Sequence, residues 1–173
     1  MADPRAGSEA RREELLARLD AVETRLDRLV ATPTPGLTEP DDGTGERWEA
    51  GQVWAHIAEF VPYWLGELQR VVAGGRAPGV ADPVPYGRTK TDPVRMEAIE
   101  RDRREDPRAL LGRATDGIAR VRAFTRALPM EGWSAVGLHP TRGEVPVERI
   151  VDASLVEHLE EHADQLEGLA RQA

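Results

Sequence analysis

The chain has 173 residues, no cysteine and a formal net charge of −8. Its length predicts one domain whose single core buries about 70% of the unfolded surface. The lack of cysteine excludes disulfides, thiolate metal ligands, iron–sulfur clusters and a cysteine nucleophile, so any thiol chemistry needs a thiol from outside the chain. The acidic balance, with a pI near 5.1, disfavours nucleic acid as a partner, because phosphate binding needs clustered Lys and Arg.

The N-terminal sequence predicts a cytoplasmic protein. Residues 1–5 lead into a charged amphipathic segment and not into an apolar signal core. No run approaches the roughly 18 apolar residues of a membrane span. We therefore expect no membrane partner, and we leave the oligomeric state open, with a homodimer among the options.

The first half of the chain predicts two long helices. The first covers residues 9–30, with Ser8 as its N-cap, and the Pro and Gly residues of 32–36 end it. The second covers residues 50–72. Its apolar stripe has His56 at the border, and Pro62 is expected to kink the helix near His56.

The middle of the chain predicts a long connection followed by a short and a long helix. Residues 73–92 contain several Gly and Pro residues and are expected to cross from one end of a bundle to the other. Asp92 and Asp106 each precede a proline, which is the pattern of an N-cap with Pro at the first helical position. We expect helices over about 93–105 and 107–128.

Residues 133–146 are rich in Gly and Pro and predict irregular turns or short extended pieces. No alternating strand pattern is present in the chain. The sequence therefore predicts an all-α fold, a four-helix bundle with a long crossover loop and a short extra helix, in a single domain over 1–173.

The last predicted helix, residues 147–171, carries two of the four histidines. His158 and His162 are four residues apart, which is about one turn and roughly 6 Å of rise, and both fall in the middle of the apolar face. Two core imidazoles each need a hydrogen-bond partner unless they share a metal ion, so the pattern favours a metal site. The acidic residues of this helix are expected on its solvated side: Glu157, Glu160, Asp164 and Glu167.

A metal ion needs at least one further ligand from elsewhere in the bundle. Neutral imidazole is the usual ligand of zinc, nickel, copper and iron, and His56 and His139 are the remaining candidates. We favour His56, because it lies on a helix near the core, whereas His139 lies in a loop. Three protein ligands leave a position for water or substrate, as in catalytic sites. Zinc and nickel are the favoured divalent ions.

Three side chains near His56 are secondary candidates. Glu59 lies one turn after His56 and Tyr63 one turn further, so either could face the open position of the metal. Glu59 is the candidate catalytic residue, as the hydrogen-bond partner of a ligand or as a proton acceptor, with an ordinary boundary residue as the alternative. Trp64 is expected in the core, with pocket lining as the alternative.

Three stretches together resemble the DinB/YfiT-like superfamily: the segment 48–56 with its helix, the loop 137–144 (GLHPTRGE) and the helix 157–166 (EHLEEHADQL). The resemblance covers nearly the whole chain. It implies an up-down-down-up four-helix bundle. Relatives in this superfamily include thiol-dependent transferases and mycothiol-dependent isomerases.

The resemblance also implies a set of ligands. Three histidines hold a divalent metal in the superfamily, and the matching residues here are His56, His158 and His162. The loop histidine is common in similar sequences without being a ligand, so His139 is carried over as a loop feature.

A competing motif overlaps the same helix. Residues 158–162, HLEEH, fit the His-x-x-Glu-His pattern of inverted zinc proteases. Those enzymes take a further ligand well downstream, and few residues follow His162. The favoured interpretation of Glu161 is a solvated carboxylate.

Three functions follow from these patterns. The leading one is a metal-dependent transferase or isomerase in which a low-molecular-weight thiol binds the open metal position, ionises and attacks a small electrophile. Mycothiol is the first candidate thiol, because the composition is rich in Arg and has Lys90 as its single lysine. The second is a hydrolase that uses metal-bound hydroxide. The third is a non-enzymatic helical stress or interaction protein.

Overall fold

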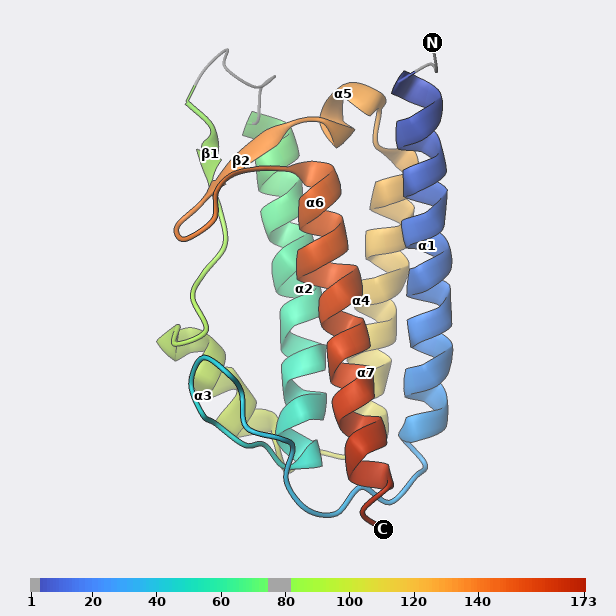
Figure 1. Ribbon diagram of the computed structural model, residues 1–173, viewed down its shortest axis with the longest axis vertical. Helices are drawn as coiled ribbons and strands as arrows, with labels where there is room; N and C mark the ends of the chain where they lie inside the picture. The colour runs from blue at the N-terminus through green and yellow to red at the C-terminus, as the bar shows by residue number, and fades with distance from the viewer. Residues whose placement is uncertain (1–3, 75–81) are drawn as a thin grey trace.

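The computed structural model describes residues 4–74 and 82–173 and is mainly helical (Figure 1). The long helices are α1 (Pro4–Leu29), α2 (Ala50–Gly74) and α4 (Pro107–Ala127), and α3 (Pro93–Asp102) and α5 (Met130–Trp133) are short. The C-terminal helix consists of α6 (Val147–Val151), the π-helical turn η1 (Asp152–Val156) and α7 (Glu157–Ala170). No helix in the described ranges is long and apolar enough to cross a membrane.

The four long helices form a bundle in which α1 and the C-terminal helix run one way and α2 and α4 run the other way (Figure 1). In chain order this is the up-down-down-up arrangement, so the predicted four-helix bundle is confirmed. The parallel neighbours α2 and α4 pack closely. Gly117 of α4 makes this possible, because a Cβ atom there would lie 2.7 Å from Val61 Cγ1.

The predicted apolar stripes meet in one core, whose largest fully buried side chains include Trp54, Trp133 and Phe60. The predicted caps of α3 and α4 are also present. The Asp92 side chain accepts from Arg95 N at 3.0 Å, and the Asp106 side chain accepts from Arg108 N at 2.9 Å. Helix α2 runs through Pro62, whose side chain is exposed.

The prediction that Ser8 caps the first helix is wrong. Helix α1 already includes Pro4, and Ser8 lies inside it. Proline is tolerated in the first turn of a helix, where its missing N–H has no intrahelical acceptor, so the sequence before Ser8 is also compatible with helix.

Residues 133–146, which are expected to form irregular turns or short extended pieces, contain two strands of a small sheet. Strands β2 (Val136–His139) and β3 (Gly143–Pro146) form an antiparallel hairpin, and β1 (Val84–Pro85) pairs parallel with β2. The short extended pieces that are one of the two expectations for this segment are therefore present, as paired strands. Each strand has at most four residues, which is too short for an alternating pattern to stand out. The predicted connection partly falls on residues 75–81, which lie outside the described residues.

Candidate metal centre

The structure brings together the three histidines that the sequence singles out. His158 Nε2 lies 3.1 Å from His56 Nε2 and 3.1 Å from His162 Nε2. The three ligand atoms are all within 4.8 Å of one another. A tetrahedral ion with metal–nitrogen bonds of about 2.05 Å has ligand atoms about 3.3 Å apart, so this spacing fits a common metal ion.

Oxygen atoms lie on the Nδ1 side of each imidazole, which is the side that faces away from the centre. They come from the residue three positions further along the same helix. Gln165 Oε1 is within hydrogen-bond distance of His162 at 2.8 Å, whereas Glu161 Oε2 is 3.5 Å from His158 and Glu59 Oε2 is 3.6 Å from His56, whose Nδ1 is buried without a hydrogen-bond partner among the described residues. An acceptor at Nδ1 favours the tautomer with its proton there, and Nε2 then presents a lone pair to the centre. Converging lone pairs are suited to a cation.

Burial favours the neutral form of the His56 and His162 rings. His56 and His162 are only 2% and 5% exposed. Burial lowers the pKa of both rings well below the usual range, and the neighbouring imidazoles lower it further. Neutral imidazole is the form that binds zinc, nickel, copper or iron. The side chain of His158 is 30% exposed and lies at the edge of the site.

The π-helical turn η1 sets the direction of His158 and His162. An α-helix turns by about 100° per residue, so the one extra residue of a π turn rotates the following helix by about that amount. Leu159, Ala163 and Leu166 thereby take the centre of the buried face, each 0% exposed. The two histidines turn toward α2, which corrects the prediction that both lie in the middle of the apolar face.

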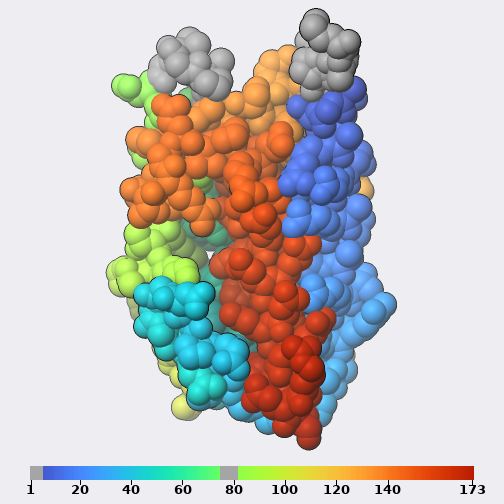
Figure 2. All heavy atoms as spheres, in the orientation of Figure 1, coloured from blue at the N-terminus to red at the C-terminus, as the bar shows by residue number. Residues whose placement is uncertain are grey.

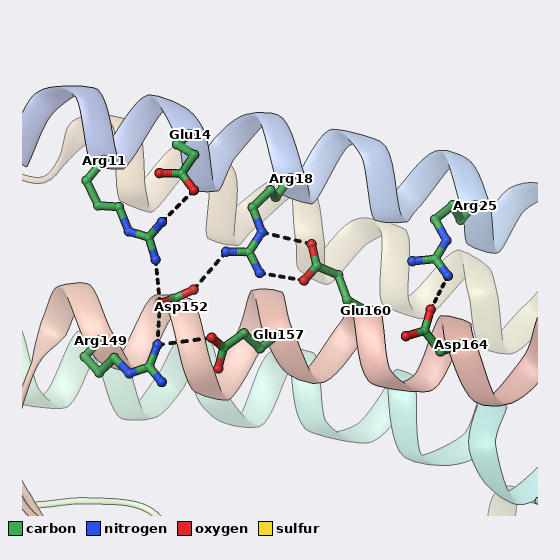
Figure 3. Close-up of polar contacts among 9 residues, drawn as sticks. All are labelled: Arg11, Glu14, Arg18, Arg25, Arg149, Asp152, Glu157, Glu160 and Asp164. Atoms are coloured by element: carbon green, nitrogen blue, oxygen red, sulfur yellow. Dashed lines mark hydrogen bonds and ion pairs between the residues drawn. The ribbon is translucent and has the colours of Figure 1, made fainter.

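The start of the π turn is held by a buried carboxylate (Figure 3). Asp152 is 3% exposed. It accepts hydrogen bonds from Arg11 at 2.6 Å, Arg18 at 3.0 Å and Arg149 at 2.5 Å. Burial alone raises the pKa of Asp152, but the hydrogen bond from Arg149 and the charge of Arg11 outweigh it and hold the pKa below the usual range. The turn is therefore tied to α1 by ion pairs.

The acidic residues that follow were expected to be solvated, and this is only partly right. Glu160 accepts two hydrogen bonds from Arg18, at 2.9 and 2.5 Å, and Asp164 pairs with Arg25 (Figure 3). The rotation in η1 directs this side of α7 toward the arginines of α1. The acidic face is thus part of the α1–α7 interface.

The centre lies in a cleft of about 860 Å³ that is lined by all three histidines. Figure 2 shows the hollow between the β2–β3 hairpin, the loop before α2 and the C-terminal helix. Residues 38–48, the segment after β1 and the hairpin supply the other walls. This volume falls in the usual range for small-molecule sites.

His139 and Trp64 also line this cleft. His139 ends β2 and is 6% exposed, but it is not among the three converging histidines. Its Nδ1 accepts a hydrogen bond from Thr141 N at 3.2 Å, so its proton is on Nε2. His139 is therefore a cleft residue of a strand and not the loop feature that the sequence predicts.

Glu59 and Tyr63 lie behind the ligand shell and do not line the cleft. The Glu59 carboxylate accepts from Arg88 Nη2 at 2.6 Å. The Arg88 guanidinium in turn lies 3.8 Å from the centre of the Tyr63 ring. Burial raises the pKa of Tyr63 to about 12. A role of Glu59 through His56 remains a prediction.

Trp48 is the main site residue that the sequence does not identify as such. Its ring is stacked on His162, with centroids 6.2 Å apart and planes at 9°, and it meets His56 edge-on at 5.3 Å. It precedes α2 at the end of a long loop. A lone aromatic residue in such a position carries no periodic signal, so its contact with the histidines depends on tertiary packing.

Comparison with solved structures identifies the class of fold. YfiT from Bacillus subtilis, described as a probable metal-dependent hydrolase with an unusual four-helix bundle topology, aligns with a TM-score of 0.71 and 20% identity over 93% of this chain and 86% of that one. The mycothiol-dependent maleylpyruvate isomerase aligns with a TM-score of 0.66 and 18% identity over 90% of this chain. The chain therefore has the DinB/YfiT-like fold, as its sequence predicts.

The present chain spans 60% of the length of that isomerase. A third similar structure is the colibactin self-resistance protein ClbS, solved in complex with double-stranded DNA, with a TM-score of 0.61 and 11% identity over 92% of this chain and 95% of that one. No protein-family model and no curated protein sequence matches the chain.

Proposed function

We propose that the protein is a divalent-metal-dependent enzyme that uses a low-molecular-weight thiol to transfer or isomerise a small electrophile. The observation that carries this proposal is the convergence of three Nε2 atoms, 3.1 Å apart in two of their pairs, in a cleft large enough for two small molecules. His56, His158 and His162 would hold the ion. Three ligands leave it open toward the cleft.

The residues of the chain have separate tasks in this function. The oxygens of Gln165, Glu161 and Glu59 orient the ligand rings, and Trp48 and Phe60 pack against them and keep water from their sides. A divalent ion held there would favour the thiolate form of a bound thiol, which is the nucleophile. The chain has no cysteine, so the thiol has to come from a co-substrate. The fold shared with a mycothiol-dependent isomerase supports a thiol of this kind.

A hydrolase is the second candidate. YfiT, which has the same fold, is described as a probable metal-dependent hydrolase. An open three-histidine site could equally activate water. The two functions differ in whether a thiol is required for turnover.

The test uses the full chain without a histidine tag, loaded with cobalt. Mycothiol, bacillithiol and glutathione are added separately, because sulfur bound to cobalt gives a charge-transfer band that oxygen ligands lack. We expect one of them to give the band and to be conjugated to a generic electrophile faster than by the metal-free protein. Turnover of esters or amides without thiol, with no band from any thiol, would replace the transferase with the hydrolase.

A further inference from the structure

Arg95 is a buried cation in the wall of the cleft. It lies in the first turn of α3 and is 9% exposed, and it is one of the residues that line the cleft. Its guanidinium lies 5.1 Å from the centre of the Trp48 ring, whose plane is stacked on His162. Arg95 and His162 thus both lie against the Trp48 ring.

The guanidinium of Arg95 has only part of its hydrogen-bonding capacity filled by the protein. Nη1 donates to Lys90 O at 2.7 Å and contacts Met96 Sδ at 3.2 Å. Within residues 4–74 and 82–173, Nε and Nη2 have no acceptor, and neither atom is completely buried. The N–H bonds of Nε and Nη2 point in parallel from one edge of a guanidinium, which matches the two oxygens of a carboxylate.

The other cations of the cleft differ from Arg95: Arg142 is exposed to solvent, and the remaining three have acidic partners. Arg88 pairs with Glu59 at 2.6 Å, Lys90 with Asp41 at 2.7 Å and Arg149 with Asp152 at 2.5 Å. No carboxylate of the described residues lies within 4.0 Å of Arg95. Burial and the charge of Arg88 lower the pKa of Arg95. A buried charge without a partner is costly, and it is retained where a ligand supplies the counter-charge.

We propose that Arg95 binds a carboxylate group of the small molecule that enters the cleft, so that the substrate is a carboxylic acid whose other end reaches the metal centre. This proposal rests on the proposed function for the location of the site, but it does not depend on a thiol. It assigns to Arg95 a role in substrate choice.

The test compares acids with their neutral amides. One series contains ω-mercapto acids of increasing chain length and their amides. Each compound is titrated into the cobalt-loaded full chain, and its binding is followed by the sulfur–cobalt charge-transfer band. A second series contains carboxylic acids without a thiol and their amides. Their binding is followed by tryptophan fluorescence, because Trp48 lies beside Arg95. We expect an acid to bind at least about tenfold more tightly than its amide, which is about 1.4 kcal/mol.

Three variants decide the result. Arg95→Met should bring the acid and the amide within about twofold of each other, and Arg95→Lys should keep part of the preference. Lys90→Met is the matched control, since it removes a cleft cation that already has Asp41 as its partner, and it should keep the full preference. Thermal unfolding and cobalt content identify any variant that fails to fold, and Arg95→Lys then decides alone.

Equal binding of acid and amide by the wild-type chain, or an unchanged preference in Arg95→Met or Arg95→Lys, would overturn the proposal. If the protein does not use a thiol, the binding results differ from those that would overturn the role of Arg95. In that case no mercapto compound produces the band, while the acids without thiol still bind more tightly than their amides and still depend on Arg95.

Discussion

The imidazoles of the candidate centre converge through Nε2, and an oxygen lies on the Nδ1 side of each ring, within hydrogen-bond distance for His162. The pairs of His162 with Gln165, His158 with Glu161 and His56 with Glu59 all have a spacing of three residues on one helix. Residues three apart on a helix are neighbours, so each helix supplies both a ligand and an oxygen beside it, and Gln165 can fix the tautomer of His162. Few other contacts are needed to prepare the site for a cation.

The first prediction concerns the metal ligands. We expect one divalent ion per chain in the wild-type protein and a sharp loss of bound metal in His56→Ala, His158→Ala and His162→Ala. His139→Ala is the control, since His139 lies in the same cleft but not among the converging nitrogens. Elemental analysis of protein purified without a tag measures the content. Full metal content in His158→Ala and His162→Ala would disprove the site.

The residues of the site differ in how far sequence reveals them. His158 and His162 share one helix face, so their spacing alone predicts that they are neighbours. His56 depends on the choice between two remaining histidines and on a family resemblance. Trp48 and Arg95 come from a loop and from the first turn of α3, and no period in the sequence connects them with the histidines. Their place in the cleft follows from how α3 packs against α2.

At the scale of elements, the second prediction uses two glycines of α2. A Cβ atom on Gly51 would overlap the carbonyl oxygen of Arg103 at the end of α3, whereas Gly66 has nothing within 4 Å. Gly51→Ala should lower the free energy of unfolding by about 1–3 kcal/mol, since backbone atoms have to move. Gly66→Ala should raise it by about 0.5–1 kcal/mol, because alanine loses less conformational entropy in a helix.

Urea unfolding of the two variants measures both effects. A stability of Gly51→Ala equal to or above that of Gly66→Ala would contradict the close approach of α2 and α3.

The third prediction concerns the buried carboxylate that holds the π turn. Asp152→Asn should lower the free energy of unfolding at neutral pH by about 1–3 kcal/mol, because it removes a charged acceptor of three arginines. Asp164→Asn is the control. The side chain of Asp164 is 71% exposed, and its loss should change the stability by less than about 1 kcal/mol.

The same comparison has a defined dependence on pH. The pKa of Asp152 is lowered in the folded chain, so its contribution is complete above the unfolded pKa of about 3.9 and is lost as the pH falls through the folded pKa. The difference between wild type and Asp152→Asn should therefore stay constant from pH 7 to about pH 5 and shrink below about pH 4. Urea unfolding across this range measures it, and a difference that grows on acidification would contradict the assignment.

Long elements with a clear apolar period are predictable here, and short or irregular ones are not. The helices with Asp-Pro caps begin where the sequence predicts, because the cap and the proline are local signals. The strands of the hairpin are too short to show alternation. The π turn is hidden for another reason. Uniform helical spacing through residues 147–171 does not reveal the one extra residue, which changes the side chains at the centre of the buried face.

At the scale of the whole molecule, the fourth prediction is that metal stabilises the fold without being needed for it. An ion that binds only the folded chain contributes about 2.7 kcal/mol at a hundredfold excess over its Kd, or about 5–10 °C in Tm for a chain of this size. The metal-free chain should still fold, because the bundle buries an extensive apolar core. Thermal scans with and without zinc, together with circular dichroism of the metal-free chain, measure both parts. A metal-free chain that is unfolded at room temperature would indicate a structural ion.

The order of the helices has a consequence for how the centre arises during folding. His56 and His158 are 102 residues apart in the chain, and they lie on α2 and on the C-terminal helix. Closing a loop of this length carries a large entropic cost before any contact compensates for it. A bound ion would therefore act as a cross-link between distant parts of the chain. In a refolding experiment, capture of the metal should lag behind the formation of helix, and it would mark the step at which the two ends of the bundle come together.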